Sequence, residues 1–407
     1  MTAPPSGYDR LLMGSPLRRR GVCLVICATL ALVLAYATLV QVFLFARMPP
    51  EIASLFLLAL MLSSLLSVFP IAVLWFLDRR ERETPWLFAA AFLWGGLIAT
   101  AVALPFNTAF FRLVDSWVAL NPVVAEILGP QAAMLLAAPL SAPFVEEIVK
   151  ACGVLLVFAF LRAEFDNMRD GLVYGALVGA GFNWYEAALY AVRGYAEFGW
   201  GMFSIQLGAR YALLGLGGHA MFTGIFGAFL GYGMQTRKTW LRVLAPLAGL
   251  VLAIAAHMLN NALPLFAALA GVAGGRPQEI EAPPDIGFFG AFLSGSLLQL
   301  TVFLPFLLIM AAAVWRSGVW ERRVIREELA DEVGRTISRA EYQDIVDDRM
   351  LRTRRIDRSH PHASAALVNA QHELAFRKNR VRNGGGDPER DPLVAGWRDD
   401  IRHLRAV

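Results

Sequence analysis

Long apolar runs alternate with short polar or charged segments along most of the chain. The apolar runs cover residues 22–45, 53–77, 86–104, 132–161, 171–191, 211–234, 243–269 and 286–315. Each run is long enough for one crossing, since a helix needs about 20 apolar residues to span the hydrocarbon core of a bilayer. The pattern therefore predicts an all-α, polytopic transmembrane helix bundle of about eight helices, because only helices satisfy the backbone of such segments in lipid.

Two regions are expected to depart from regular membrane helices. Pro139 and Pro143 lie inside the fourth run, where proline removes helical hydrogen bonds and predicts a kink or a broken start. Residues 106–130 are polar and amphipathic, and we expect 108–117 to lie in the membrane interface with aromatic side chains on one face.

Composition supports a membrane protein and excludes an ordinary soluble enzyme. The 407 residues are 57% hydrophobic and 17% charged, whereas soluble domains carry about 25% charged residues. The three cysteines all lie in apolar runs, so neither a disulfide framework nor a zinc-finger site is predicted.

Basic residues lie at alternate ends of the apolar runs. Their clusters fall at residues 18–20, 79–82, 162–169, 237–242 and 316–326. Such alternation follows the positive-inside rule and predicts that both termini are cytoplasmic. The net charge of +4 is therefore explained by membrane topology, and no nucleic-acid partner is expected.

Three segments are predicted along the chain. Residues 1–20 form a cytoplasmic amino-terminal segment, and 21–316 form the transmembrane domain. Residues 317–407 form a polar, cytoplasmic extension whose interspersed acids and bases indicate a solvated surface. Within it, 321–350 should form one or two helices, and the glycine-rich stretch 383–388 should form a linker or turn.

The fourth run contains Glu146, Glu147 and Lys150, although each ionisable group at membrane depth costs roughly 3 kcal/mol or more. Other costly polar residues lie inside the later runs, and their estimated depths converge. These residues are Asn183, Glu186, His219, His257 and Asn261. Each one alone could be structural, but together they favour a functional site.

Hydrolysis in a cavity is the chemistry that suits this set. A desolvated carboxylate can act as a general base on water, and a histidine and an amide can donate hydrogen bonds to an oxyanion. Helical geometry rotates Glu147 about 100° from Glu146, so both cannot reach one water unless the helix is kinked. The sequence contains neither a Gly-x-Ser-x-Gly nor a His-Glu-x-x-His motif.

The ordered motifs resemble those of PrsW-type intramembrane proteases, in the superfamily that includes the CAAX prenyl endopeptidases and bacteriocin-processing enzymes. The four motifs are Glu146-Glu147-x-x-Lys150, Phe182-x-x-x-Glu186, an isolated His219, and His257-x-x-x-Asn261. They span a motif core of residues 135–263. CAAX-type relatives carry histidine at the position of Glu186, so the resemblance favours the PrsW branch.

The resemblance implies a role for each matching residue. Glu146 would activate the water, with support from Glu147 and Lys150, and Glu186 would help to hold it. His257 and Asn261 would form the oxyanion site and His219 would line the cavity. Phe182 would pack behind Glu186, and Asn183 would support the site on the same helix.

Metal dependence stays open at this point, since the family has been described as metal-dependent. Zinc could be held by Glu146, Glu186, His219 and His257. Lys150 beside them supplies a positive charge already and favours metal-free catalysis, without a cofactor.

We therefore expect an integral membrane endopeptidase of the bacterial inner membrane, acting on membrane-protein substrates within or near the bilayer. The resemblance suggests a single-pass regulator such as an anti-sigma factor as substrate. Two alternatives use the same residues or the tail differently: a proton-coupled transporter and a non-proteolytic membrane scaffold.

Overall fold

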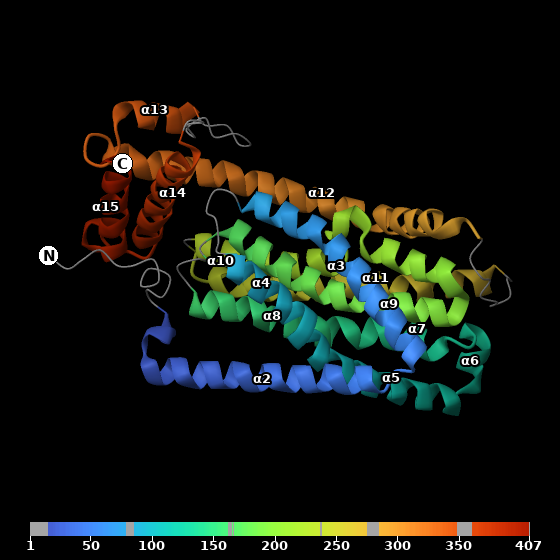
Figure 1. The fold of residues 1–407 in the computed structure, drawn as a ribbon. Coiled ribbons are helices and arrows are strands. Elements are labelled where there is room, and N and C mark those ends of the chain that lie inside the picture. Colours follow the sequence, from blue (N-terminus) through green and yellow to red (C-terminus); the bar gives the residue numbers. More distant parts are fainter. Residues whose placement is uncertain are drawn as a thin grey trace.

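The computed structural model describes residues 15–78, 85–161, 165, 167–236, 238–274, 285–347 and 360–406, and within these ranges the chain forms helices and no strand. The helices are α2 (Arg20–Ala46), α3 (Pro50–Leu77), α4 (Pro85–Leu93), α5 (Thr100–Leu120), α6 (Pro122–Leu128), α7 (Ala132–Leu140), α8 (Ala142–Phe160), α9 (Met168–Arg210), α10 (His219–Gln235), α11 (Leu241–Ala273), α12 (Gly287–Leu329), α13 (Arg339–Asp347), α14 (Pro361–Asn383) and α15 (Pro392–Ala406). The predicted all-α helix bundle is confirmed (Figure 1).

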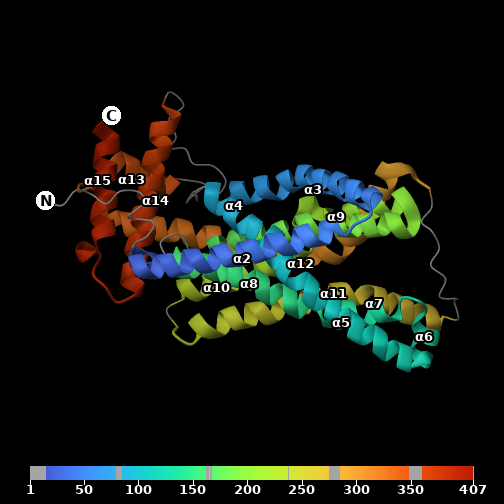
Figure 2. The ribbon, with the colours of Figure 1, turned by 60° about the horizontal axis from the view of Figure 1, so that its bottom comes forward.

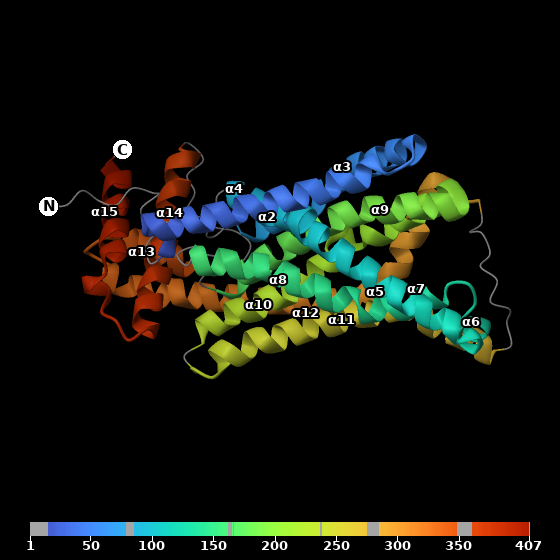
Figure 3. The same cartoon turned by 90° about the horizontal axis from the view of Figure 1, so that it is seen from below.

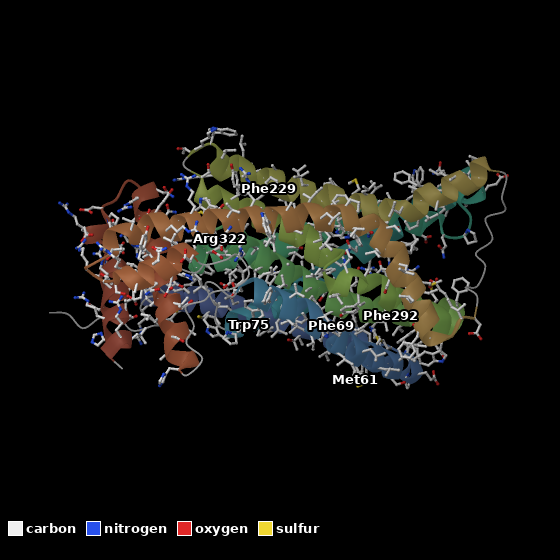
Figure 4. The ribbon with its side chains drawn as sticks, turned by 90° about the horizontal axis from the view of Figure 1, so that it is seen from above. Met61, Phe69, Trp75, Phe229, Phe292 and Arg322 are labelled. Carbon is white, nitrogen blue, oxygen red and sulfur yellow. The ribbon has the colours of Figure 1, made fainter. Side chains whose placement is uncertain are left out.

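Among the described residues, five helical segments are long and apolar enough to cross a membrane. They are Arg20–Ala46, Pro50–Leu77, Pro85–Leu120, Leu241–Ala273 and Gly287–Glu332. Large apolar side chains such as Met61 and Phe69 project from the outer face of α3, and both are more than half exposed (Figure 4). Such a surface suits lipid, because a soluble protein rarely exposes a large continuous apolar patch.

Helix α9 lies inside the bundle, where it packs against α3, α10 and α12. Glycine lets α9 and α10 approach closely: a Cβ atom at Gly175 would lie 2.3 Å from the carbonyl oxygen of Thr223. A Cβ atom at Gly179 would lie 2.1 Å from the carbonyl oxygen of His219. This contact brings the side chains of α10 next to those of α8 and α9.

The third membrane segment is longer than the sequence indicated. Helix continues from α4 through a π-helical turn, η2 (Trp94–Ala99), and past Pro105 to the end of α5, so the expected connection at 106–130 is wrong in its first half. The amide of Gln41 donates to the Leu97 carbonyl at 2.9 Å and so satisfies one backbone group of the irregular turn. Val118 packs against α6 and α7 in a small apolar cluster.

The expected break in the fourth run is confirmed, since α7 and α8 separate at Ser141. The predicted boundaries of the next two helices are wrong. α9 continues to Arg210 across a kink at Phe198 and Gly199, and His219 is the first residue of α10 instead of lying two turns inside it. Leu213 and Leu214 precede α10 with φ near +57°, in the left-handed region that side chains disfavour.

The tail is helical and has an apolar core of its own. The end of α12 packs with α13, α14 and α15 around Leu329, Leu374 and Phe376, at one end of the bundle (Figure 1). Residues 384–387 form the expected turn between α14 and the next short helix. The basic residues at 79–82, 162 and 237, and residues 1–14 of the amino-terminal segment, lie outside the described residues.

Figure 2 shows α5, α6 and α7 together at the end of the bundle that lies away from the tail.

Candidate active site

The side chain of Lys150 lies at the centre of the charged residues on α8. Its Nζ atom is 3.2 Å from Glu146 Oε2 and 2.8 Å from Glu147 Oε1, and the lysine has no exposed surface. Helical spacing explains both contacts, since residues three and four apart share one face. The ammonium also lies 3.8 Å from the centre of the Phe182 ring, a cation–π contact.

The two adjacent glutamates face different parts of the molecule. Glu146 Oε1 accepts a hydrogen bond from Asn107 Nδ2 of α5 at 3.0 Å. Glu147 instead accepts from Thr223 Oγ1 of α10 at 2.9 Å and from His257 Nδ1 of α11 at 3.0 Å. The helix break precedes both residues and does not turn one back toward the other, so they share Lys150 but have different hydrogen-bond donors on the other helices.

His219 links Lys150 of α8 to Glu186 of α9. Its Nδ1 atom lies 2.8 Å from Lys150 Nζ, and its Nε2 atom is hydrogen-bonded to Glu186. Because an ammonium can only donate, Nδ1 is the accepting nitrogen and Nε2 carries the proton. Arg210 Nη1 lies 2.5 Å from Glu186 Oε2, so Glu186 is paired with both residues.

His257 has its ring fixed on both sides. The ring stacks on Phe222 with centroids 4.8 Å apart, and Glu147 accepts from Nδ1. Since an ionised carboxylate can only accept, the proton lies on Nδ1 and the lone pair of Nε2 faces Glu146, whose Oε2 is 4.0 Å away. A neutral His257 therefore presents an acceptor to the site.

A cavity of about 440 Å³ opens beside this cluster between α5, α7, α8 and α9. Its lining includes Glu146, Glu186 and Phe182 from the predicted set. Ala137, Ala138 and Ala142 also line the cavity, and their short side chains take up little of its space. Within the described residues, Glu146 is thus a carboxylate that both meets the cavity and contacts Lys150.

Asn183 and Asn261 lie at the edge of the cluster. Asn261 Nδ2 donates to the backbone carbonyl of Ala138 at 3.2 Å, between α11 and α7. Asn183 Nδ2 donates to the carbonyl of Arg210 at 3.1 Å and holds the segment that carries this arginine. Both amides therefore fix the walls of the site in this conformation.

Sequence reasoning missed three partners of the site: Asn107, Arg210 and Thr223. Asn107 was missed because residues 106–130 were expected to form a polar, amphipathic connection outside the bundle. Arg210 falls between the predicted runs 171–191 and 211–234 and so was expected in a connection, although it lies at the end of a 43-residue helix. The unpaired charge of Glu186 was the available signal, because a buried carboxylate requires a donor or a cation.

The donor set at the centre is compatible with a zinc ion. Ligand atoms of Glu146, His219 and His257 lie within 4.8 Å of one another, and carboxylate and imidazole are zinc ligands. Glu147 and Glu186 accept from the opposite nitrogens of the two histidines, as carboxylates commonly do behind metal-bound histidines. Lys150 contacts Glu146 Oε2 and His219 Nδ1, so its ammonium competes with a cation for two of these atoms.

The apolar helical fold and the buried carboxylate–imidazole cluster are the features expected from the resemblance to intramembrane proteases. A profile of the PrsW family intramembrane metalloproteases matches residues 83–294, which is more than half of the chain. The chain belongs to this family, and the resemblance carried by its four motifs is confirmed.

A similar relative is the protease PrsW of Geobacillus kaustophilus (strain HTA426), which is 32% identical over 105 residues. The aligned part is 25% of this chain and 42% of the relative, so it spans less than half of that protein. No solved structure matches the chain with significance.

Proposed function

We propose that this protein is an integral membrane endopeptidase that hydrolyses peptide bonds of membrane-protein substrates within or near the bilayer. The observation that carries this proposal is the position of Glu146. Its carboxylate lines the 440 Å³ cavity and accepts hydrogen bonds from Lys150 and from Asn107. The family match supports the same reaction class.

In the proposed reaction, Glu146 takes a proton from water while the water oxygen attacks the carbonyl carbon of the scissile peptide. The tetrahedral intermediate collapses as the C–N bond breaks, and Glu146 returns the proton to the leaving amine. Lys150 balances the negative charge of the neighbouring carboxylates. Glu147, which accepts hydrogen bonds from Lys150, Thr223 and His257, stays an anion that holds these groups in position.

The histidines and amides have supporting roles in this proposal. His257 and His219 surround Glu146 and can share its proton through His257 Nε2. Glu186, which lines the cavity, keeps His219 and Arg210 fixed behind it. The oxyanion role expected of Asn261 would require it to leave Ala138, which accepts its hydrogen bond here.

Zinc, if present, would be held by Glu146, His219 and His257 and would supply Lewis-acid polarisation of a carbonyl group. The contacts of Lys150 with two of these residues favour the metal-free site proposed from the sequence.

We further propose a bacterial inner-membrane location with both termini in the cytoplasm. The beginning of α2 and the tail helices lie at the same end of the bundle, which supports this orientation (Figure 3). A single-pass regulatory protein, such as an anti-sigma factor, is the proposed class of substrate.

The test is cleavage of single-pass membrane proteins by the purified chain and its Glu146→Gln variant. We expect the variant to lose at least about 10³-fold in rate, because it keeps the shape but cannot accept the proton. Glu126→Gln is a matched control, since Glu126 is exposed on α6. Equal cleavage by the parent and Glu146→Gln would reject the proposal.

A further inference from the structure

Asn107 on α5 lies outside the four segments that carry Glu146, Glu186, His219 and His257, yet it lines the same cavity as Glu146 and Glu186. Its Nδ2 atom donates to Glu146 Oε1 at 3.0 Å, and its Oδ1 atom accepts from Ser141 Oγ at 2.9 Å. Ser141 is buried at the break between α7 and α8. The amide thus ties α5 to both halves of the broken helix.

These two hydrogen bonds fix the orientation of the amide. An ionised Glu146 can only accept, so the NH₂ group must face it, and the Ser141 hydroxyl then donates to the carbonyl oxygen. An asparagine amide has two N–H groups. The second N–H of Asn107 has no partner within the described part of the chain, and the residue lines the cavity.

Three other donors of the cluster are already engaged by protein acceptors. His257 Nδ1 donates to Glu147, and Asn261 donates to Ala138. Arg210 is held by Glu186. An oxyanion donor must lie close to the reacting water and must be oriented before the reaction, which Asn107 satisfies through its bonds to Glu146 and Ser141.

We propose that Asn107 is a catalytic residue of the protease reaction, a role that rests on the function proposed above. One N–H orients Glu146 as the general base, and the other donates to the oxyanion of the substrate. As the water oxygen bonds to the carbonyl carbon, the carbonyl π electrons move to the oxygen beside this N–H. They return when the C–N bond breaks and the proton on Glu146 passes to the amine.

The experiment compares the parent, Asn107→Ala, Asn107→Asp and Ser141→Ala on one cleaved membrane substrate. We expect Asn107→Ala to lower kcat by about 10²–10³-fold, as the loss of an oxyanion donor does, with KM changed by less than about threefold. Asn107→Asp keeps the side-chain shape but lacks both N–H groups, so it should lose as much. Ser141→Ala removes only the hydrogen bond that orients the Asn107 amide, so its kcat should fall by about tenfold.

A peptide aldehyde inhibitor gives a second measurement, because its hydrate carries the tetrahedral geometry of the intermediate. Its inhibition constant should rise with Asn107→Ala by at least about tenfold. Asn121→Ala, at the carboxyl end of the same helix, is the control and should match the parent.

The outcomes separate this inference from the proposed function. If Glu146→Gln abolishes cleavage while both Asn107 variants keep the parental kcat, Asn107 has no catalytic role and the protease proposal stands. A loss that appears only in KM would likewise overturn the inference. If Glu146→Gln cleaves normally, the proposed function itself fails. Thermal unfolding identifies a misfolded Asn107→Ala, in which case the isosteric Asn107→Asp decides.

Discussion

At the residue scale, Lys150 is the group on which the charge balance of the site depends. Its three N–H donors meet three acceptors, on Glu146, Glu147 and His219. Two carboxylates cannot both remain ionised in a buried site without such a partner, because the desolvation penalty of each is several kcal/mol. The lysine therefore allows adjacent glutamates to have different tasks.

Replacing Lys150 with methionine should have two measurable effects. Loss of the buried partner should lower stability by about 3–5 kcal/mol, seen as a lower midpoint of thermal unfolding in detergent. It should also raise zinc affinity by at least about tenfold, because a positive charge leaves the candidate ligand atoms. Zinc bound per chain is measured by elemental analysis and competition with a chelator.

Lys238→Met, a change at an exposed lysine, is the control and should alter neither property. Parental protein that retains one zinc per chain and loses cleavage when it is removed would contradict the metal-free site. An unchanged zinc affinity in Lys150→Met would contradict competition by the ammonium.

At the element scale, the close contact of α9 with α10 sets the distance between Glu186 and His219. The contact depends on glycines whose missing side chains leave room for backbone oxygens. A helix of ordinary residues would hold α10 farther away and would separate the histidine from its carboxylate. Element packing therefore determines the site geometry as much as the identity of its residues does.

Gly175→Ala should loosen this contact, since the added Cβ atom would lie 2.3 Å from the Thr223 carbonyl oxygen. We expect a destabilisation of about 1–3 kcal/mol and a matching loss of cleavage, measured by thermal unfolding and by initial rates. In Gly21→Ala, nothing lies within 4 Å of the new atom, so this control should keep parental stability. Equal stability of the two variants would count against tight packing here.

At the scale of the whole molecule, one long helix joins the bundle to the tail. Glu321 of α12 pairs with Arg169 at the start of α9 at 3.0 Å, and both side chains are buried. Farther along, buried Lys378 of α14 pairs with Glu332 at 2.7 Å. These ion pairs connect α14 to the short helix Ala330–Glu332 that directly follows α12, and α12 to the helix that carries Glu186.

The tail should loosen in acid. Hydrogen bonds from Arg398, then from Arg335, hold the pKa of Glu389 at about 2, below its ordinary value. A depressed folded-state pKa contributes stability above the ordinary value near about 4.3, and this contribution is lost as the pH falls toward 2. Protection factors of α15 amides in hydrogen exchange should therefore fall between pH 6 and pH 3.

Glu389 is half exposed, so solvent screening keeps the expected effect small. The Glu389→Gln variant, which cannot ionise, is the control and should show a weaker dependence on pH. If its α15 amides lose protection to the same extent as those of the parent, another group is responsible.

Much of the fold followed from the apolar runs. Their length required helices, and Pro139 and Pro143 correctly indicated the break near Ser141. The misplaced boundaries, at 106–130 and before His219, lie where polar residues interrupt a helix without ending it. Hydropathy cannot distinguish such residues from a loop, because only a neighbouring helix reveals whether each polar group has a partner.

The sequence alone determined the class of protein and the residues that had to meet, because ionisable groups in apolar helices require partners within the membrane. It could not determine which partners they find. The tertiary structure decided that Glu146 faces the cavity and Asn107, that Glu147 faces Thr223 and His257, and that Arg210 returns to Glu186. These contacts join different helices, and only the packing of those helices fixes their register and rotation.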